Sequence, residues 1–191
     1  MIRSVLFLII LMMIISCKEK TWTVTKLLYF TVYGVTYDSL SNPHLGINRY
    51  LEFNDKGQNK MARGKIYSKT ESAPNHGLEI FTELKLDEKS ISLIQETLGN
   101  KDYDSTYNSH WEPRCCYFLY ETSDNKKKII TFGTNETTPY ELEELMHHLE
   151  YFLEYQYRYK RIGHFSVDSM VLKLESEIFI NYPPPPKPIM E

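Results

Sequence analysis

Side chains of the types used in catalysis gather most densely in the segment "SHWEPRCC", residues 109–116. It places His110, Trp111, Glu112 and Arg114 directly before a pair of adjacent cysteines. Imidazole, carboxylate and thiol groups are the bases, acids and nucleophiles of hydrolases and thiol redox proteins. The alternative is a structured connection with Trp111 packed into the core. Because loops on a rigid scaffold often carry function, we keep Trp111 as a candidate binding residue and assign no catalytic residue.

The adjacent Cys115 and Cys116 are restricted in the bonds that they can form. Successive Cα atoms lie about 3.8 Å apart, whereas the Cα atoms joined by a disulfide are roughly 4.4–6.8 Å apart. In a strand, neighbouring side chains also point to opposite faces. We therefore expect two small residues, at least one of them buried and reduced. A strained redox disulfide, a metal site and an intermolecular bond are the alternatives.

His147 and His148 follow acidic residues in a helical segment. Glu144 and His147 have the E-x-x-H spacing of carboxylate-bridged metal sites. Such sites need further acidic helices facing inward, and helical periodicity places both residues opposite a leucine stripe. We expect surface i,i+4 pairs instead, Glu143 with His147 and Glu144 with His148. We predict no metal site and no cofactor.

Motifs of several large enzyme classes are absent from the sequence. It contains no G-x-S-x-G elbow, no G-x-x-x-x-G-K-[ST] phosphate loop and no H-E-x-x-H zinc motif. The net charge of the 191-residue chain is −3, so its composition gives no support for nucleic acid as a partner.

Tyrosines and basic residues alternate in "YFLEYQYRYKR", residues 151–161. Aromatic and basic side chains together can bind sugars, anionic polymers or another protein. The alternative is a helix end or an edge strand whose tyrosines are half-buried. The candidate binding residues are Tyr151, Tyr155, Tyr157, Arg158 and Tyr159.

The first residues of the chain have the pattern of a secretory signal. Arg3 and the amino terminus precede an apolar run over residues 5–15, which is followed by the small Ser16. A membrane-spanning helix needs about 20 apolar residues, so this run is too short to anchor the chain by itself.

The stretch "IISC", residues 14–17, resembles the lipobox of bacterial lipoproteins, with Ile14 where leucine is more common. The resemblance implies that residues 1–16 are removed and that Cys17 carries acyl chains that hold the protein at a membrane. Two or three chains bind almost permanently, since each buried CH₂ contributes about 0.8 kcal/mol. An ordinary cleaved signal and an uncleaved anchor are the alternatives. The resemblance implies a place in the cell envelope, at the outer membrane, and leaves the membrane face open.

The rest of the chain divides into elements by its periodicity. Residues 17–21 form a linker and residues 22–181 one domain. Alternation and turn signals predict strands over 26–35, 47–54, 60–68, 78–86, 115–122, 127–133 and 164–174. Asp87 and Gly99 bound one predicted helix. Thr138 caps a second, which runs from Pro139 with Glu141 completing a capping box.

This order of elements, without strand–helix–strand alternation, predicts an α+β fold: a mainly antiparallel sheet of about six or seven strands with two helices packed on one face. We expect residues 182–191 to form a proline-rich tail with polyproline II geometry. The layout resembles small lipoproteins of the Bacteroidota of unknown function. We expect a non-catalytic binding module for a protein or polymer. The alternatives are a structural component of an envelope complex and a hydrolase or thiol redox protein that uses the 110–116 loop.

Overall fold

The computed structural model describes residues 22–37, 40, 42–56, 59–67, 79–81, 86–99, 101–107, 115–133, 137–155, 167–181 and 183. In chain order the elements are β1 (Val24–Tyr37), β2 (Pro43–Asn54), β3 (Lys60–Tyr67), β4 (Glu79–Phe81), α2 (Glu88–Leu98), β5 (Cys115–Thr122), β6 (Lys127–Phe132), α3 (Tyr140–Glu154) and α4 (Ser169–Asn181). The predicted α+β class is confirmed.

The strands form one sheet in the order β4-β3-β2-β1-β5-β6, and each neighbouring pair is antiparallel. The long β1 lies in the middle, where Lys26 pairs with Asn54 of β2 and Val24 pairs with Thr122 of β5. This register places the start of β1, the β2–β3 turn and the β5–β6 turn at one end of the sheet. The β1–β2 connection lies at the other end.

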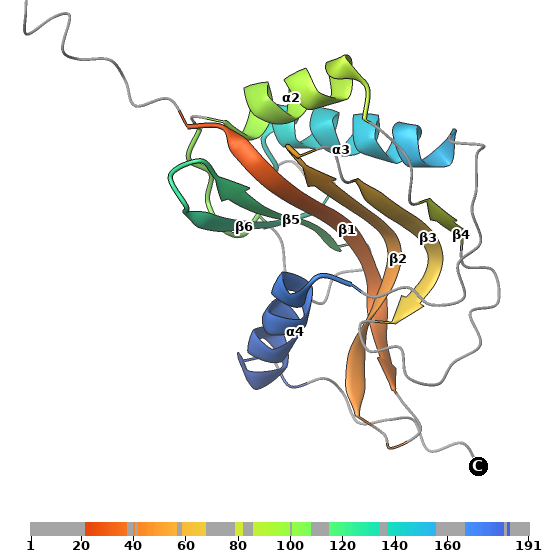
Figure 1. Ribbon diagram of the computed structural model, residues 1–191. Coiled ribbons are helices and arrows are strands. Elements are labelled where there is room, and N and C mark those ends of the chain that lie inside the picture. The colour runs from red at the N-terminus through yellow and green to blue at the C-terminus, as the bar shows by residue number, and fades with distance from the viewer. Residues whose placement is uncertain are drawn as a thin grey trace, which may run out of the picture.

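Both faces of the sheet carry helices. Figure 1 shows α2 and α3 together on one face and α4 on the other. Alternate residues of β1 divide between the two cores: Tyr29 packs with α2 and α3, whereas Leu28 and Phe30 pack with α4. The two predicted helices are present on one face as α2 and α3, but the described residues contain a third helix, α4, on the opposite face, which was not predicted.

The helix α4 replaces the strand predicted over residues 164–174. Asp168 accepts a hydrogen bond from the Met170 backbone N–H at 2.9 Å, which satisfies a donor at the start of the helix. Its carboxylate also lies 2.6 Å from Lys26 Nζ. Partial burial acts in the opposite direction, but these hydrogen bonds hold the pKa of Asp168 below its usual value. The buried Val171, Leu174 and Ile178 follow helical spacing.

The helix α2 has the ends that the sequence predicts. Asp87 Oδ1 accepts a hydrogen bond from the Ser90 backbone N–H at 2.7 Å. Hydrogen bonds from Ser90 hold the pKa of Asp87 below its usual value. At the other end Gly99 is the C-cap, and a Cβ there would collide with the Gln95 carbonyl oxygen.

The predicted helix α3 is confirmed. The Thr138 hydroxyl donates to the Gly133 carbonyl at 2.5 Å. Pro139 occupies the N-cap position and has no side-chain cap bond. The core-facing stripe is as predicted, since Leu142, Leu145, Met146, Leu149 and Leu153 are buried. None of the helices in the described part of the chain is long and apolar enough to cross a bilayer.

Candidate functional site

A pocket of about 330 Å³ opens where α3 crosses the middle strands of the sheet. Its walls come from β1, the β2 residues next to it, the start of β5, and the second half of α3. The lining residues are Thr31, Val32, Tyr33, Asn48, Arg49, Cys116, Met146, His147 and Glu150. The pocket therefore combines charged, hydroxyl, amide, aromatic and sulfur groups.

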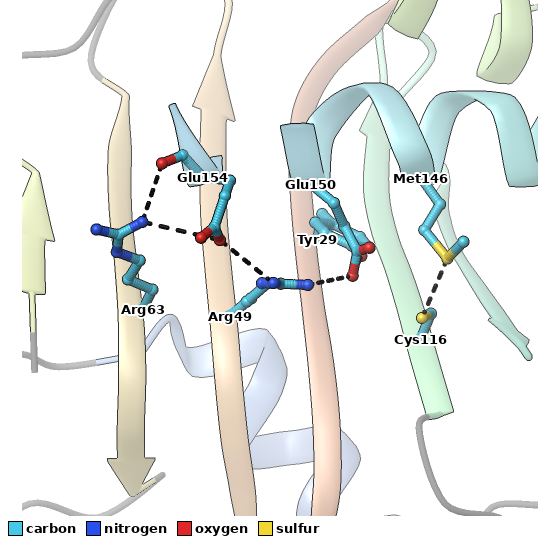
Figure 2. A network of polar contacts seen from close by, with 7 residues as sticks. All are labelled: Tyr29, Arg49, Arg63, Cys116, Met146, Glu150 and Glu154. Atoms are coloured by element: carbon cyan, nitrogen blue, oxygen red, sulfur yellow. Dashed lines mark hydrogen bonds and ion pairs between the residues drawn. The ribbon is translucent and has the colours of Figure 1, made fainter. Parts of the chain in front are cut away.

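Arg49 is the charged residue at the centre of this arrangement. Alternation in β2 places it on the same face as Leu51 and Phe53, which pack against α2 and α3. The guanidinium does not meet a hydrophobic helix surface, because its Nη1 lies 2.8 Å from Glu150 Oε1 on α3 (Figure 2). A half-buried, charge-assisted hydrogen bond of this kind is stronger than a neutral one.

Tyr29 extends the same network into the core. Its hydroxyl donates to Glu150 Oε1 at 3.2 Å, and Figure 2 shows both side chains converging from β1 and α3. Burial above all, with Cys116 and Glu150 nearby, raises the pKa of Tyr29 well above its usual value. The phenol therefore stays protonated and serves as a permanent donor to the carboxylate.

The carboxyl end of α3 is held by arginines from the strands. This helix has no basic residue in its last turn, where the partial negative charge of the helix dipole accumulates. Arg63 Nη1 of β3 donates to the Glu154 carbonyl at 3.0 Å, one of the carbonyls without a partner inside the helix. Arg49 Nη2 lies 3.4 Å from Glu154 Oε2. The two arginines thus fix the position of α3 above the sheet (Figure 2).

Sulfur atoms form one wall of the pocket. Cys116 Sγ donates to Met146 Sδ at 3.4 Å (Figure 2). Cys116 is buried and forms no disulfide, as the sequence predicts for at least one of the two cysteines. The side chain of Cys115 lies outside the described residues. Cys116 packs against Met146 and so forms part of the wall.

Tyr33 lies at the rim of the pocket, at a point where β1 departs from regular strand geometry. The pairing of β1 with β2 shifts register between Val32 and Gly34. The ring of Tyr33 lies over Gly46 of β2, since a Cβ at Gly46 would approach the ring to 2.6 Å. Only glycine leaves room for the tyrosine, which stays exposed at the pocket mouth.

The outer face of α3 continues the pocket as an exposed aromatic surface. Tyr151 and Tyr155 are 64% and 51% exposed, and their ring centroids are 4.3 Å apart. Tyr151 follows the exposed His147 by one helical turn. We call His147, Tyr151 and Tyr155 the α3 outer face. It contains two of the tyrosines that the sequence proposes for binding.

Several candidates from the sequence cannot be placed. Residues 108–114, with Trp111 and its neighbours, lie outside the described residues. Residues 156–166 do so as well, and with them Tyr157, Arg158 and Tyr159. The structure therefore brings Tyr151 and Tyr155 together and leaves the other candidate binding residues untested.

The helix histidines have separate surroundings. His147 is exposed at the pocket, as predicted. His148 is half-buried, and its Nε2 lies 2.8 Å from Ser90 Oγ of α2, whereas the sequence predicts a surface pair with Glu144. Among the described residues, no group of three or more histidine, cysteine, aspartate or glutamate side chains could hold a metal ion.

Five residues of the pocket were not among the candidates from the sequence: Thr31, Tyr33, Asn48, Arg49 and Glu150. A signal for two of them, Arg49 and Glu150, is present in the sequence: an arginine on the apolar side of a strand, and glutamates one turn apart in the helix that covers it. The pocket is suited to holding a polar ligand by hydrogen bonds, with aromatic contacts from Tyr33 and the α3 outer face. Comparison of the chain with protein-family models, curated proteins and solved structures found no match.

Proposed function

We propose that this protein is a lipid-anchored component of the bacterial cell envelope whose α+β domain binds a protein or polymer partner without catalysing a reaction. The proposed anchor is Cys17, in the lipobox-like stretch at residues 14–17, and the proposed location is the outer membrane. The observation that carries the binding function is the pair of exposed tyrosines in ring contact on the α3 outer face, next to the pocket.

Exposed tyrosines at this position favour recognition for a physical reason. Tyrosine joins a large apolar ring to a polar tip and loses little conformational freedom on binding, so it is enriched at interfaces. Arg49 and Glu150 of the pocket are already held in place by each other. A partner would meet a surface that needs little rearrangement, which lowers the entropic cost of binding.

Affinity purification with crosslinking from native membranes tests this proposal. Replacing both tyrosines, Tyr151→Ala with Tyr155→Ala, should lower partner recovery about tenfold or more, because buried tyrosines often contribute over 1 kcal/mol each. The matched control is Tyr140→Ala, since Tyr140 is 73% exposed at the first position of the same helix. Equal recovery with the double variant and the control would contradict the proposed surface.

An alternative is a structural component of an envelope complex. It is favoured by α4, where Ile180 is 79% exposed and Leu172 and Phe179 are only partly buried. In that case Ile180→Asp would release the protein from a stably associated complex and the double tyrosine variant would not.

A second alternative, a hydrolase or thiol redox protein that uses the 110–116 loop, is favoured by the exposed His147 at a polar pocket. Activity in a hydrolase screen without any specific partner would support it over binding.

A further inference from the structure

We infer that the end of the sheet at which β1 begins lies against the lipid surface, with Trp22 next to the lipid headgroups. We call this the β1-start end; it comprises Trp22, the β5–β6 turn and residues 101–104. The inference rests on the proposed anchor at Cys17. It adds the orientation of the domain relative to the membrane. This orientation determines whether a partner reaches the pocket from the water or from the lipid.

The length of the chain between anchor and domain sets a strict limit. Five peptide units join Cys17 to Trp22, and they span at most about 18 Å when fully extended. The acylated sulfur must lie at the membrane interface, because its chains are buried in the bilayer. Trp22 therefore cannot be farther than this from the lipid surface, whatever conformation the linker adopts.

The start of β1 offers no additional slack, because it is bound on both sides. Val24 N–H donates to Gln95 Oε1 and the Val24 carbonyl accepts from Gln95 Nε2, both at 2.8 Å. Ser123 N–H donates to the Thr23 carbonyl at 2.8 Å, and Thr23 N–H donates to Ser123 Oγ at 3.1 Å. The tether thus begins at a fixed point between α2 and the β5–β6 turn.

The chemistry of the β1-start end suits a lipid interface. Trp22 is half-buried, and Lys128 Nζ lies 4.0 Å from the centre of its ring. Tryptophan is typical of membrane–water interfaces, where its ring lies at headgroup level. The Lys128 ammonium already pairs with Asp102 at 2.5 Å. Lys126 and Lys127 are exposed beside them, but they pair with Asp124 and Glu121 at 3.1 Å each. The tether, more than charge attraction, therefore holds this end at the surface.

The same geometry places the pocket away from the lipid. Thr31 lies nine residues after Trp22 along β1, which corresponds to about 30 Å of strand. The end of β1 at Tyr37 pairs with the start of β2 at Pro43, and this pair is farther still, at the opposite end of the sheet (Figure 1). With the β1-start end at the lipid surface, a partner that reaches the pocket comes from the aqueous phase or from a polymer in it.

Energy transfer from tryptophan to a dansyl-labelled lipid headgroup tests the orientation. The probe is the full, acylated chain, added to preformed vesicles of phosphatidylethanolamine and phosphatidylglycerol. The chain contains two tryptophans, so Trp111→Phe leaves Trp22 as the only one. Because Trp22 lies within about 18 Å of the surface, we expect the dansyl lipid to lower its emission by about half or more.

The matched control moves the tryptophan to the far end of the sheet. Leu40 is 81% exposed, so Leu40→Trp in a chain with Trp22→Phe and Trp111→Phe should fold. More than about 40 Å of strand separates position 40 from position 22. We therefore expect the dansyl lipid to lower the emission of this variant by less than about a tenth. Stronger transfer from the tryptophan at position 40 than from Trp22, or none from either, in a chain that sediments with the vesicles would overturn the orientation alone. A chain without acyl groups by mass spectrometry, which does not sediment, would overturn the proposed anchor instead.

Discussion

At the scale of single residues, two charged side chains fasten helices to the sheet from positions that are otherwise apolar. Arg49 joins β2 to α3, and Glu175 joins α4 to β2. Glu175 is buried, with Oε2 accepting the Leu45 backbone N–H at 2.7 Å and Oε1 3.3 Å from His44 Nδ1. A buried carboxylate is costly unless its oxygens are hydrogen-bonded. These bonds therefore explain how α4 tolerates an acid on its core-facing side.

Removal of the Glu175 carboxylate should destabilise the protein strongly. Glu175→Ala leaves the Leu45 N–H without its acceptor and opens a cavity, so we expect the free energy of unfolding to fall by about 3 kcal/mol. Urea denaturation measures the difference. The control is Glu177→Ala on the same helix. The Glu177 carboxylate is half-exposed, and its ion pair with Lys173 Nζ is long at 3.7 Å. That pair contributes at most about 0.5 kcal/mol. Similar losses for the two variants would contradict the role assigned to Glu175.

The residues of the pocket show what a sequence can and cannot indicate. The exposed tyrosines on α3 could be predicted, because helical periodicity places Tyr151 and Tyr155 outside the leucine stripe. The network around Arg49 could not, since its partners Glu150 and Glu154 are more than 100 residues away. Periodicity assigns a side chain to a face, but only the packing of a helix on that face supplies the partner.

At the scale of elements, local signals explain why most helices and strands could be predicted and α4 could not. The end signals of α2, Asp87 and Gly99, act within one turn of the helix and are formed as expected. In contrast, "HFSVDSMVLKL" contains β-branched residues and partial alternation, which favour a strand. The Asp168 carboxylate lies 2.6 Å from Lys26 Nζ, and the Asp168 backbone N–H donates to the Tyr50 hydroxyl at 3.1 Å. Both partners lie outside the segment, so no residue within it indicates this start of the helix. Tertiary contacts therefore decided between helix and strand.

A pair of isoleucines in α4 distinguishes these two conformations. Ile178 and Ile180 would share one face in a strand, but in a helix they point to different sides. Ile178 is 3% exposed and Ile180 is 79% exposed. We expect Ile178→Ala to lower the free energy of unfolding by about 2–4 kcal/mol and Ile180→Ala to change it by less than about 0.5 kcal/mol. Chemical denaturation of both variants provides the measurement, and equal losses would indicate a strand.

At the scale of the whole molecule, the sheet lies between helix layers with separate hydrophobic cores. One core joins α2 and α3 to the sheet, and the other joins α4 to it. Because both faces are covered, β1 carries an almost unbroken run of buried residues from Leu27 to Val32. The helix α4 is therefore required for one of the two cores.

Truncation of the chain tests this dependence on α4. A chain that ends at residue 166 loses Val171, Leu174 and Ile178, whose burial contributes roughly 1.5–3 kcal/mol each. Their sum is comparable with a typical domain stability of about 5–15 kcal/mol. Loss of these residues would also leave Leu28, Phe30 and Tyr50 facing water. We expect this chain to bind a hydrophobic dye and to lose cooperative unfolding. A chain that ends at residue 183 keeps α4 and should unfold like the full protein. Cooperative unfolding of the shorter chain, without dye binding, would show that α2 and α3 alone stabilise the sheet.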